Sequence, residues 1–241
     1  MTGKTWTPIE GFAGNMFNGG GFKIKGLTAP LFGATTTGFI TNVHLEFDEM
    51  KYYDQTIHQI GGNDWVVMGA LVCFLNNTSA IISNCSVSGT INIPDGMAKL
   101  GYIGGIVGYT TSTRKFSHIV SKADINVSGN IQKSQFIAGC VSYTAGSLDN
   151  CQNLGNISVN PTSSATYEFA VSGITALSGD ITNCINGSDK DGEIGKYGNI
   201  TISGTLNKTN YFGGISSKQA TNIKNSHNYG NIDVGGEQKN Q

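Results

Sequence analysis

Hydrophobic and polar residues alternate in short runs along this chain, and the runs recur. In the clearest of them two apolar residues flank a polar one, at Ile91/Ile93, Ile125/Val127, Ile157/Val159, Ile200/Ile202 and Ile232/Val234. Alternation with a period of two is typical of a half-buried β-strand. We therefore predict a strand at each of these places, with its apolar pair facing inward and the residue between them facing outward.

A glycine-marked apolar stretch precedes these strands. Gly105 and Gly139 are 34 residues apart, as are Gly139 and Gly173. When the repeats are aligned, each equivalent position forms a column, and two apolar columns flank the glycine. One consists of Leu31, Leu71, Ile106, Cys140, Ile174 and Ile215 and the other of Met68, Ile103, Ile137, Val171 and Phe212. Because the two columns are three residues apart, which breaks strand alternation, we expect the glycine to mark a bulge or a bend.

A further short strand is predicted between these two. Its repeated feature is a polar residue followed by a small or apolar one, and the polar column consists of Asn42, Asn84, His118, Asn150, Asn183 and Asn225. Each repeat therefore contains three predicted strands, and like residues align from one repeat to the next.

This arrangement predicts an all-β solenoid, in which each coil buries its inward face on its neighbours. We expect one domain over residues 1–241, a right-handed parallel β-helix with three strands per coil, in which residues 1–33 form an N-terminal capping rung and residues 34–241 about six coils. Insertions at 50–64 and 187–196 would lie at corners. The alternative is a six-bladed β-propeller, although a blade requires four strands.

Composition agrees with this class and excludes several functions. The chain has 34 glycines and 24 asparagines, and only 13% of its 241 residues are charged. Its net charge of −1 gives no electrostatic basis for binding nucleic acid or an anionic membrane. No apolar run approaches the ~20 residues of a membrane span. No signal peptide is recognisable either, so the protein is cytosolic or its export signal has been removed, and we favour the second.

The N-terminal residues carry a resemblance to a known family. The pattern comprises Trp6, Pro8, Ile9, Phe12, Gly14, Phe17, Gly19, Gly21, Ile24, Gly26, Leu27 and Leu31 to Gly33, and the later Gly104 to Gly108 and Ile-x-Asn-Cys strings fit it as well. It resembles bacterial surface proteins with GLUG motifs, found mostly in gut Bacteroidetes among adhesin-like proteins and immunoglobulin A peptidases. The resemblance implies a parallel β-helix that is secreted or attached to the cell surface.

On this basis we expect a non-catalytic module, an adhesion or binding scaffold or a spacer, without a cofactor, whose partner is a host glycan or surface protein. The alternative is a carbohydrate-active enzyme, a polysaccharide lyase or glycoside hydrolase, which needs two or more carboxylates or a metal cluster on one strand face. In the aligned columns Asp124, Asp149 and Asp180 each stand alone. The HExxH motif of a metallopeptidase is also absent from the sequence.

The cysteines and one acidic segment are the candidates for a metal site or a disulfide. Cysteines without a C-x-x-C pair do not favour zinc, and no metal site is expected. Cys151 and Cys184 fall on neighbouring coils, within disulfide range, but buried apolar packing is the favoured interpretation. Residues 189–194 resemble the middle of a calcium loop, yet Gly187 and Gly198 occupy the first and twelfth ligand positions, which favours a solvated turn.

Two columns of asparagine are expected to form amide ladders along the stack, namely Asn150, Asn183 and Asn225, and Asn156, Asn199 and Asn231.

The candidate binding site is an aromatic column. Phe74, Tyr109 and Tyr143 recur on successive coils at a position that faces outward, and Tyr102, Phe136 and Tyr211 form a similar, interrupted column. A row of exposed rings could stack on sugars or on an apolar protein surface. The alternative is that the rings only cover a corner of the fold.

Overall fold

The computed structural model describes residues 5–51, 53, 56–60, 63–93, 95, 99–162, 167–204, 206 and 209–235, with the backbone alone at 56–60 and 63. Across these residues the chain is all-β: its strands form three open sheets, and no helix is present that could cross a membrane. Expectations that concern residues 1–4 and 236–241 lie outside the described residues.

The first and second sheets are built from the glycine-marked stretches. The first contains β6 (Thr56–Ile60), β7 (Asn63–Gly69), β10 (Leu100–Gly104), β13 (Gln135–Ala138), β18 (Phe169–Ser172) and β23 (Tyr211–Gly213). The second contains β3 (Phe32–Thr35), β8 (Val72–Leu75), β11 (Val107–Thr110), β14 (Val141–Thr144), β19 (Thr175–Leu177) and β24 (Ser216–Gln219).

The third sheet collects the remaining strands. Its members are β1 (Met16–Asn18), β2 (Lys23–Lys25), β4 (Phe39–Thr41), β5 (His44–Lys51), β9 (Ile81–Ile93), β12 (Phe116–Gly129), β15 (Leu148–Asp149), β16 (Gln152–Asn153), β17 (Ile157–Pro161), β20 (Ile181–Thr182), β21 (Ile185–Asn186), β22 (Ile200–Ile202), β25 (Ile223–Lys224), β26 (His227–Asn228) and β27 (Ile232–Val234). The two strands predicted after each glycine stretch therefore lie in one sheet, and in β9 and β12 they are continuous.

Strands of successive repeats pair in parallel, with registers that align the predicted columns. In the first sheet Ile103 pairs with Met68 on one side and Ile137 on the other. In the third sheet Ile125 pairs with Ile91 and with Ile157. Propeller blades are antiparallel sheets, so this long parallel pairing is consistent with a solenoid and does not fit the six-bladed alternative.

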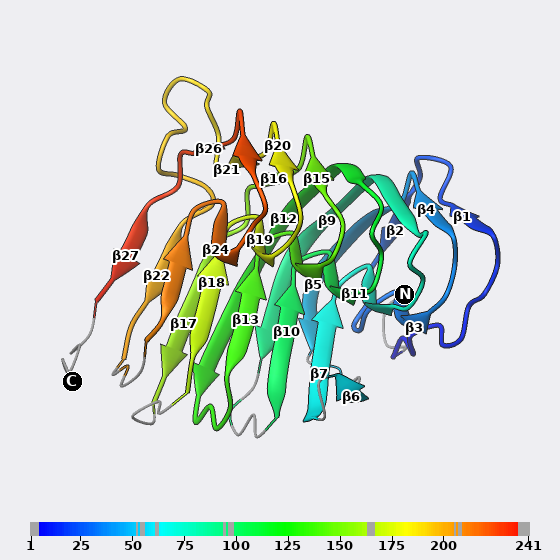
Figure 1. Cartoon of the computed structure of the whole chain (residues 1–241), viewed down its shortest axis with the longest axis horizontal. Coiled ribbons are helices and arrows are strands. Elements are labelled where there is room, and N and C mark those ends of the chain that lie inside the picture. The colour runs from blue at the N-terminus through cyan, green and yellow to red at the C-terminus, as the bar shows by residue number, and fades with distance from the viewer. Residues whose placement is uncertain are drawn as a thin grey trace.

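Within each sheet the strands follow one another along the long axis of the molecule, from the N-terminal strands at the right of Figure 1 to β27 at the left. One apolar core runs through the stack from Leu27 to Leu206 and includes both columns that flank the glycines. The alternation predicted around the Ile-x-Val strands is confirmed, because Ile125 and Val127 are buried while Asn126 between them is less so.

The glycine column forms a bend, as expected, and the bend divides each predicted first strand between two sheets. Gly139 connects β13 to β14, and Gly173 connects β18 to β19. A Cβ atom on Gly139 would collide with the side chain of Asn153, and one on Gly173 with that of Asn186. Close packing against a buried asparagine is thus a reason for glycine here that the sequence pattern alone did not reveal.

The polar column expected within the second strand has a different backbone conformation from the one predicted. Its residues are all left-handed, with φ between 48° and 54°, at Asn42, Asn84, His118, Asn150, Asn183 and Asn225. Asparagine tolerates this conformation better than most residues because its short polar side chain can hydrogen-bond locally. The column therefore marks a bend between strands at four of the six positions and a left-handed residue within the continuous β9 and β12 at the other two, where a regular extended strand was expected.

The insertion at 50–64 also differs from the expected corner loop. β5 continues to Lys51, and β6 pairs with β7 in an antiparallel hairpin that extends the first sheet at its N-terminal edge.

Residues near the N-terminus pack on the first repeat. The indole nitrogen of Trp6 donates a hydrogen bond to the Pro30 carbonyl at 2.8 Å. Phe12 and Phe17 contact the buried Phe32, with ring centroids 5.5 and 5.1 Å from its own. These contacts cover the apolar end of the core at this side of the stack.

Candidate functional site

Aromatic side chains gather outside the main core, across the bend between the first and second sheets. We call the aromatic strip the set formed by Trp65, Tyr102 and Phe136 of the first sheet and Phe74, Tyr109 and Tyr143 of the second. Strand pairing aligns Phe74, Tyr109 and Tyr143 on three successive strands of the second sheet, as predicted.

The rings of the strip contact one another both along the stack and across the bend. Along the second sheet the Tyr109 and Tyr143 rings are stacked 4.3 Å apart with planes 4° from parallel, and Phe74 lies 5.8 Å from Tyr109. Across the bend, Tyr102 meets Tyr109 edge to face at 5.0 Å. The two columns that the sequence analysis treated separately therefore form one cluster.

The exposure of the strip is uneven. Tyr102 and Phe136 are each only 7% exposed, whereas Phe74, Tyr109 and Tyr143 are half-buried. The predicted column is thus less exposed than a row of isolated surface rings would be, because its neighbours across the bend cover part of each ring. The accessible edges belong to the three residues that the sequence analysis named as ligand-binding and to Trp65, which is also partly exposed.

Trp65 belongs to the strip but was missed as a site residue. Its ring stacks on Tyr102, with centroids 4.3 Å apart. Trp65 pairs in register with Leu100, so it is two residues away from the position that column alignment would match with Tyr102. Alignment of columns therefore could not find it.

Two phenols of the strip, those of Tyr102 and Tyr109, are neutral. Burial, reinforced by the neighbouring Tyr143, raises the pKa of Tyr109 to about 12. Burial likewise raises the pKa of Tyr102 well above its ordinary value. Tyr102 and Tyr109 therefore present uncharged rings and hydroxyl groups at neutral pH.

An ion pair borders the strip on the C-terminal side. The Lys218 ammonium group lies 2.5 Å from the Glu168 carboxylate and 5.0 Å from the centroid of the Phe136 ring. Beside Tyr143, a hollow of about 190 Å³ opens between Leu177 and Gln219. The strip thus passes from an apolar surface into a polar one within about one coil, an arrangement suited to an amphipathic ligand.

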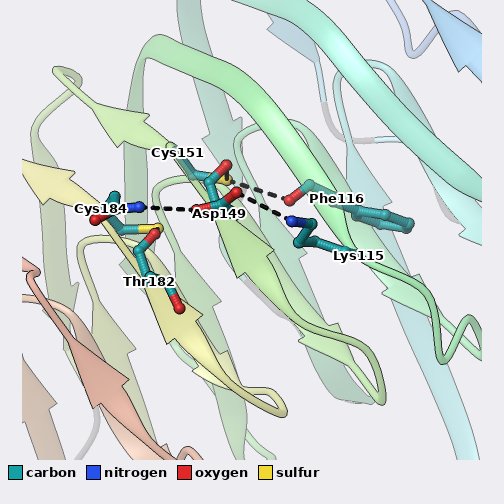
Figure 2. Close-up of polar contacts among 7 residues, drawn as sticks. Lys115, Phe116, Asp149, Cys151, Thr182 and Cys184 are labelled. Atoms are coloured by element: carbon teal, nitrogen blue, oxygen red, sulfur yellow. Dashed lines mark hydrogen bonds and ion pairs between the residues drawn. The ribbon is translucent and has the colours of Figure 1, made fainter.

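All five cysteines are buried as free thiols: Cys73, Cys85, Cys140, Cys151 and Cys184. The thiols of Cys151 and Cys184 lie close to backbone carbonyls, at 3.5 Å from Asp149 O and 3.3 Å from Thr182 O (Figure 2). Burial raises the pKa of Cys73 to about 12 and that of Cys85 to about 11. The burial of all five cysteines agrees with the packing interpretation.

The three isolated aspartates each bond to a neighbouring repeat. The Asp149 carboxylate accepts a hydrogen bond from Lys115 at 3.2 Å (Figure 2) and another from Asn183 at 3.1 Å. Asp124 accepts a hydrogen bond from the Asn156 backbone amide at 2.7 Å, and Asp180 accepts one from the Asn222 side chain at 2.8 Å. All three join one coil to the next.

The calcium-like segment forms a chain of turns between β21 and β22. The side chains of Asp189 and Asp191 are exposed, and the Glu193 carboxylate accepts a hydrogen bond from the Ser188 hydroxyl at 2.6 Å. Within the described residues no group of three or more histidine, cysteine or acidic side chains could hold a metal ion.

The asparagine ladders differ from those predicted. The Asn156 and Asn199 side-chain oxygens each accept from the backbone amide of the next residue in their column, at 3.0 and 2.8 Å. In the other predicted column Asn183 donates a hydrogen bond to the Asp149 carboxylate and not to an asparagine.

A buried amide ladder lies three residues further on and was not predicted. The Asn153 side chain donates a hydrogen bond to the side-chain oxygen of Asn186 at 2.8 Å, and the Asn186 side chain donates one to that of Asn228 at 2.7 Å. The constant offset of three residues from the left-handed column was the signal that could have revealed it.

Comparison of the chain with protein-family models, with curated proteins and with solved structures gives no match.

Proposed function

We propose that this chain is a right-handed parallel β-helix of six to seven coils, three strands per coil, that acts as a non-catalytic module at a bacterial cell surface. The parallel pairing of successive repeats and the single core along them support the architecture. The resemblance to GLUG-motif surface proteins in the N-terminal residues supports the location. In this role the stack is a scaffold that holds a binding surface of fixed geometry.

The observation that carries the proposal is the aromatic strip. Its rings repeat once per coil, and paired strands are about 4.8 Å apart, which is too close for one sugar ring on each side chain but suits a continuous amphipathic ligand. The partner is a host glycan or a surface protein that lies along the stack. Each ring contributes on the order of 1 kcal/mol when covered, so one module binds weakly and a multivalent surface binds by avidity.

The experiment replaces Tyr109 and Tyr143 by serine, singly and together, and compares binding on arrays of glycans and host surface proteins. The proposal expects the double variant to lose most of the binding, because the stacked pair supplies the most regular part of the strip. Phe22→Ser, which removes an exposed ring outside the strip, is the matched control and should bind as the unmodified protein does.

Thermal unfolding of each variant separates loss of ligand contact from loss of fold. Unchanged binding by a folded double variant contradicts the proposal. Any glycan that binds should be recovered intact after prolonged incubation, whereas its cleavage would favour the carbohydrate-active alternative.

A further inference from the structure

A second hollow lies on the outer face of the third sheet and shares no lining residue with the strip. The loop between β21 and β22 projects from the stack, as the gold segment at the upper left of Figure 1 shows. Beneath it is a groove of about 570 Å³. This volume falls within the ~300–1,000 Å³ of ordinary small-molecule sites.

The groove has an apolar floor and an aromatic rim. Leu154 and Ile185, both partly exposed, come from successive coils of the third sheet. Tyr197, at the end of the projecting loop, is 41% exposed and lines the same groove. An aromatic ring next to an aliphatic floor offers a surface on which the C–H face of a sugar ring can stack.

Polar groups with unused hydrogen-bonding capacity surround this floor. Asp124 accepts one backbone amide, which leaves its second carboxylate oxygen available. The side chain of Gln152 donates to the Gly187 carbonyl at 3.0 Å, so its own carbonyl oxygen remains available. In the part of the chain that the structure describes, the Lys122 and Lys190 ammonium groups form no ion pair.

The charges of the groove nearly cancel. Two lysines, Lys122 and Lys190, face three carboxylates, those of Asp124, Asp189 and Glu193. This balance neither attracts a polyanion nor creates a strong cation site. Donors and acceptors interspersed around an apolar floor match a ligand with many hydroxyl groups and no net charge.

From this combination we infer that the groove under the β21–β22 loop is a binding site for a neutral saccharide. The sugar ring lies on Leu154, Ile185 and Tyr197, and its hydroxyl groups bond to Asp124, Gln152 and the two lysines. The inference does not depend on the aromatic strip, because the two surfaces share no residue.

The test begins with the full chain on an array of neutral, amino and acidic oligosaccharides, followed by calorimetry with the neutral glycan that binds best. Tyr197→Ser and Lys122→Ala are expected to weaken that affinity about tenfold each, a loss equivalent to one stacking contact or one hydrogen bond to a charged group. Asp124→Asn retains the bond to the Asn156 amide and should weaken binding to a smaller extent.

Two controls test for general effects of losing an exposed ring or a charge. Phe22→Ser and Lys224→Ala both replace exposed residues outside the groove and the strip, so both should leave the affinity unchanged. The inference is overturned if no neutral glycan binds, if only acidic glycans bind, or if the groove variants bind as well as the unmodified protein. Loss of binding in Tyr143→Ser alone would assign the glycan to the strip instead.

Discussion

Single residues with a left-handed backbone set the sharp bend that recurs in the third sheet. Five of the six are asparagine and the sixth is His118, with φ of 54°. Left-handed backbone costs roughly 1–2 kcal/mol for an ordinary residue and less for asparagine. The repetition of asparagine is therefore explained by backbone conformation, with side-chain ladders as a secondary consequence.

This explanation predicts the effect of substitutions at His118, which is exposed. His118→Asn should raise the free energy of unfolding by ~0.5 kcal/mol, and His118→Val should lower it by ~1–2 kcal/mol, because a β-branched residue tolerates positive φ poorly. Urea denaturation followed by circular dichroism measures both. If valine were as stable as asparagine at this position, the left-handed bend would not be the reason for the column.

The buried amide ladder is a second feature at this scale. Asn186 donates both to Asn228 and to the Gly198 carbonyl at 2.7 Å, and its own oxygen accepts from Asn153. Asn186→Ala removes these hydrogen bonds, two of which join it to the buried Asn153 and Gly198, and should lower the free energy of unfolding by ~3 kcal/mol. Asn222→Ala, which loses an exposed bond to Asp180, is the control and should cost ~0.5 kcal/mol or less. Equal losses in both variants would contradict a special role for the ladder.

The Asp149 carboxylate connects adjacent coils in a pH-dependent way. Partial burial raises its pKa, but hydrogen bonds from Lys115 and Asn183 outweigh this effect and hold the pKa below its usual value. A lowered folded-state pKa contributes stability above the unfolded value of about 3.9, and this contribution is lost as the pH falls through the folded pKa.

Lys115→Ala should therefore be less stable than the unmodified protein at pH 6, by up to ~1 kcal/mol for this exposed pair. The difference should disappear near pH 2. Denaturation midpoints across this pH range test it, with Lys224→Ala as the control. A difference that persisted at pH 2 would assign the effect of Lys115 to packing.

At the scale of strands, the sequence predicted the features that depend on alternation and on alignment of the repeats, namely the position of the strands and their pairing partners. The Ile125/Val127 strands and the partners of Ile103 follow from burial on every coil, since a shift of one residue would expose the apolar face. The division of the first strand into two sheets could not be predicted, because it depends on how Asn153 packs over Gly139.

The candidate sites were predicted to different extents. The Phe74, Tyr109 and Tyr143 column follows from register alone and was found. The contact between Tyr102 and Tyr109 requires the angle of the bend, and the groove requires the path of the β21–β22 loop. Neither is encoded in a periodic pattern.

Burial of the cysteines on inward strand positions predicts their chemistry. All five are inside the structure, and burial raises the pKa of most of them, so the reactive thiolate is scarce at neutral pH. A thiol reagent should label fewer than one cysteine per chain in the native protein and all five after denaturation, as measured by mass spectrometry. Rapid native labelling of Cys151 or Cys184 would contradict their inward placement.

At the scale of the whole molecule, stacking converts a sequence repeat into straight columns of side chains. Every feature proposed to bind a ligand depends on this alignment: the strip on three successive strands of the second sheet, and the groove on adjacent coils of the third.

Distances between spin labels along one outward column test this stacking most directly. Strand pairing places Asp233 three coils from Asn126, four from Asn92 and five from Lys51. At about 4.8 Å per coil, backbone separations near 14, 19 and 24 Å are expected. Cysteines introduced at these exposed or partly exposed positions should react selectively, because the native thiols are buried. Electron spin resonance on the three doubly labelled proteins should give distances that increase by one constant step per coil. Distances that fail to increase in this order would contradict the parallel stack and both binding surfaces built on it.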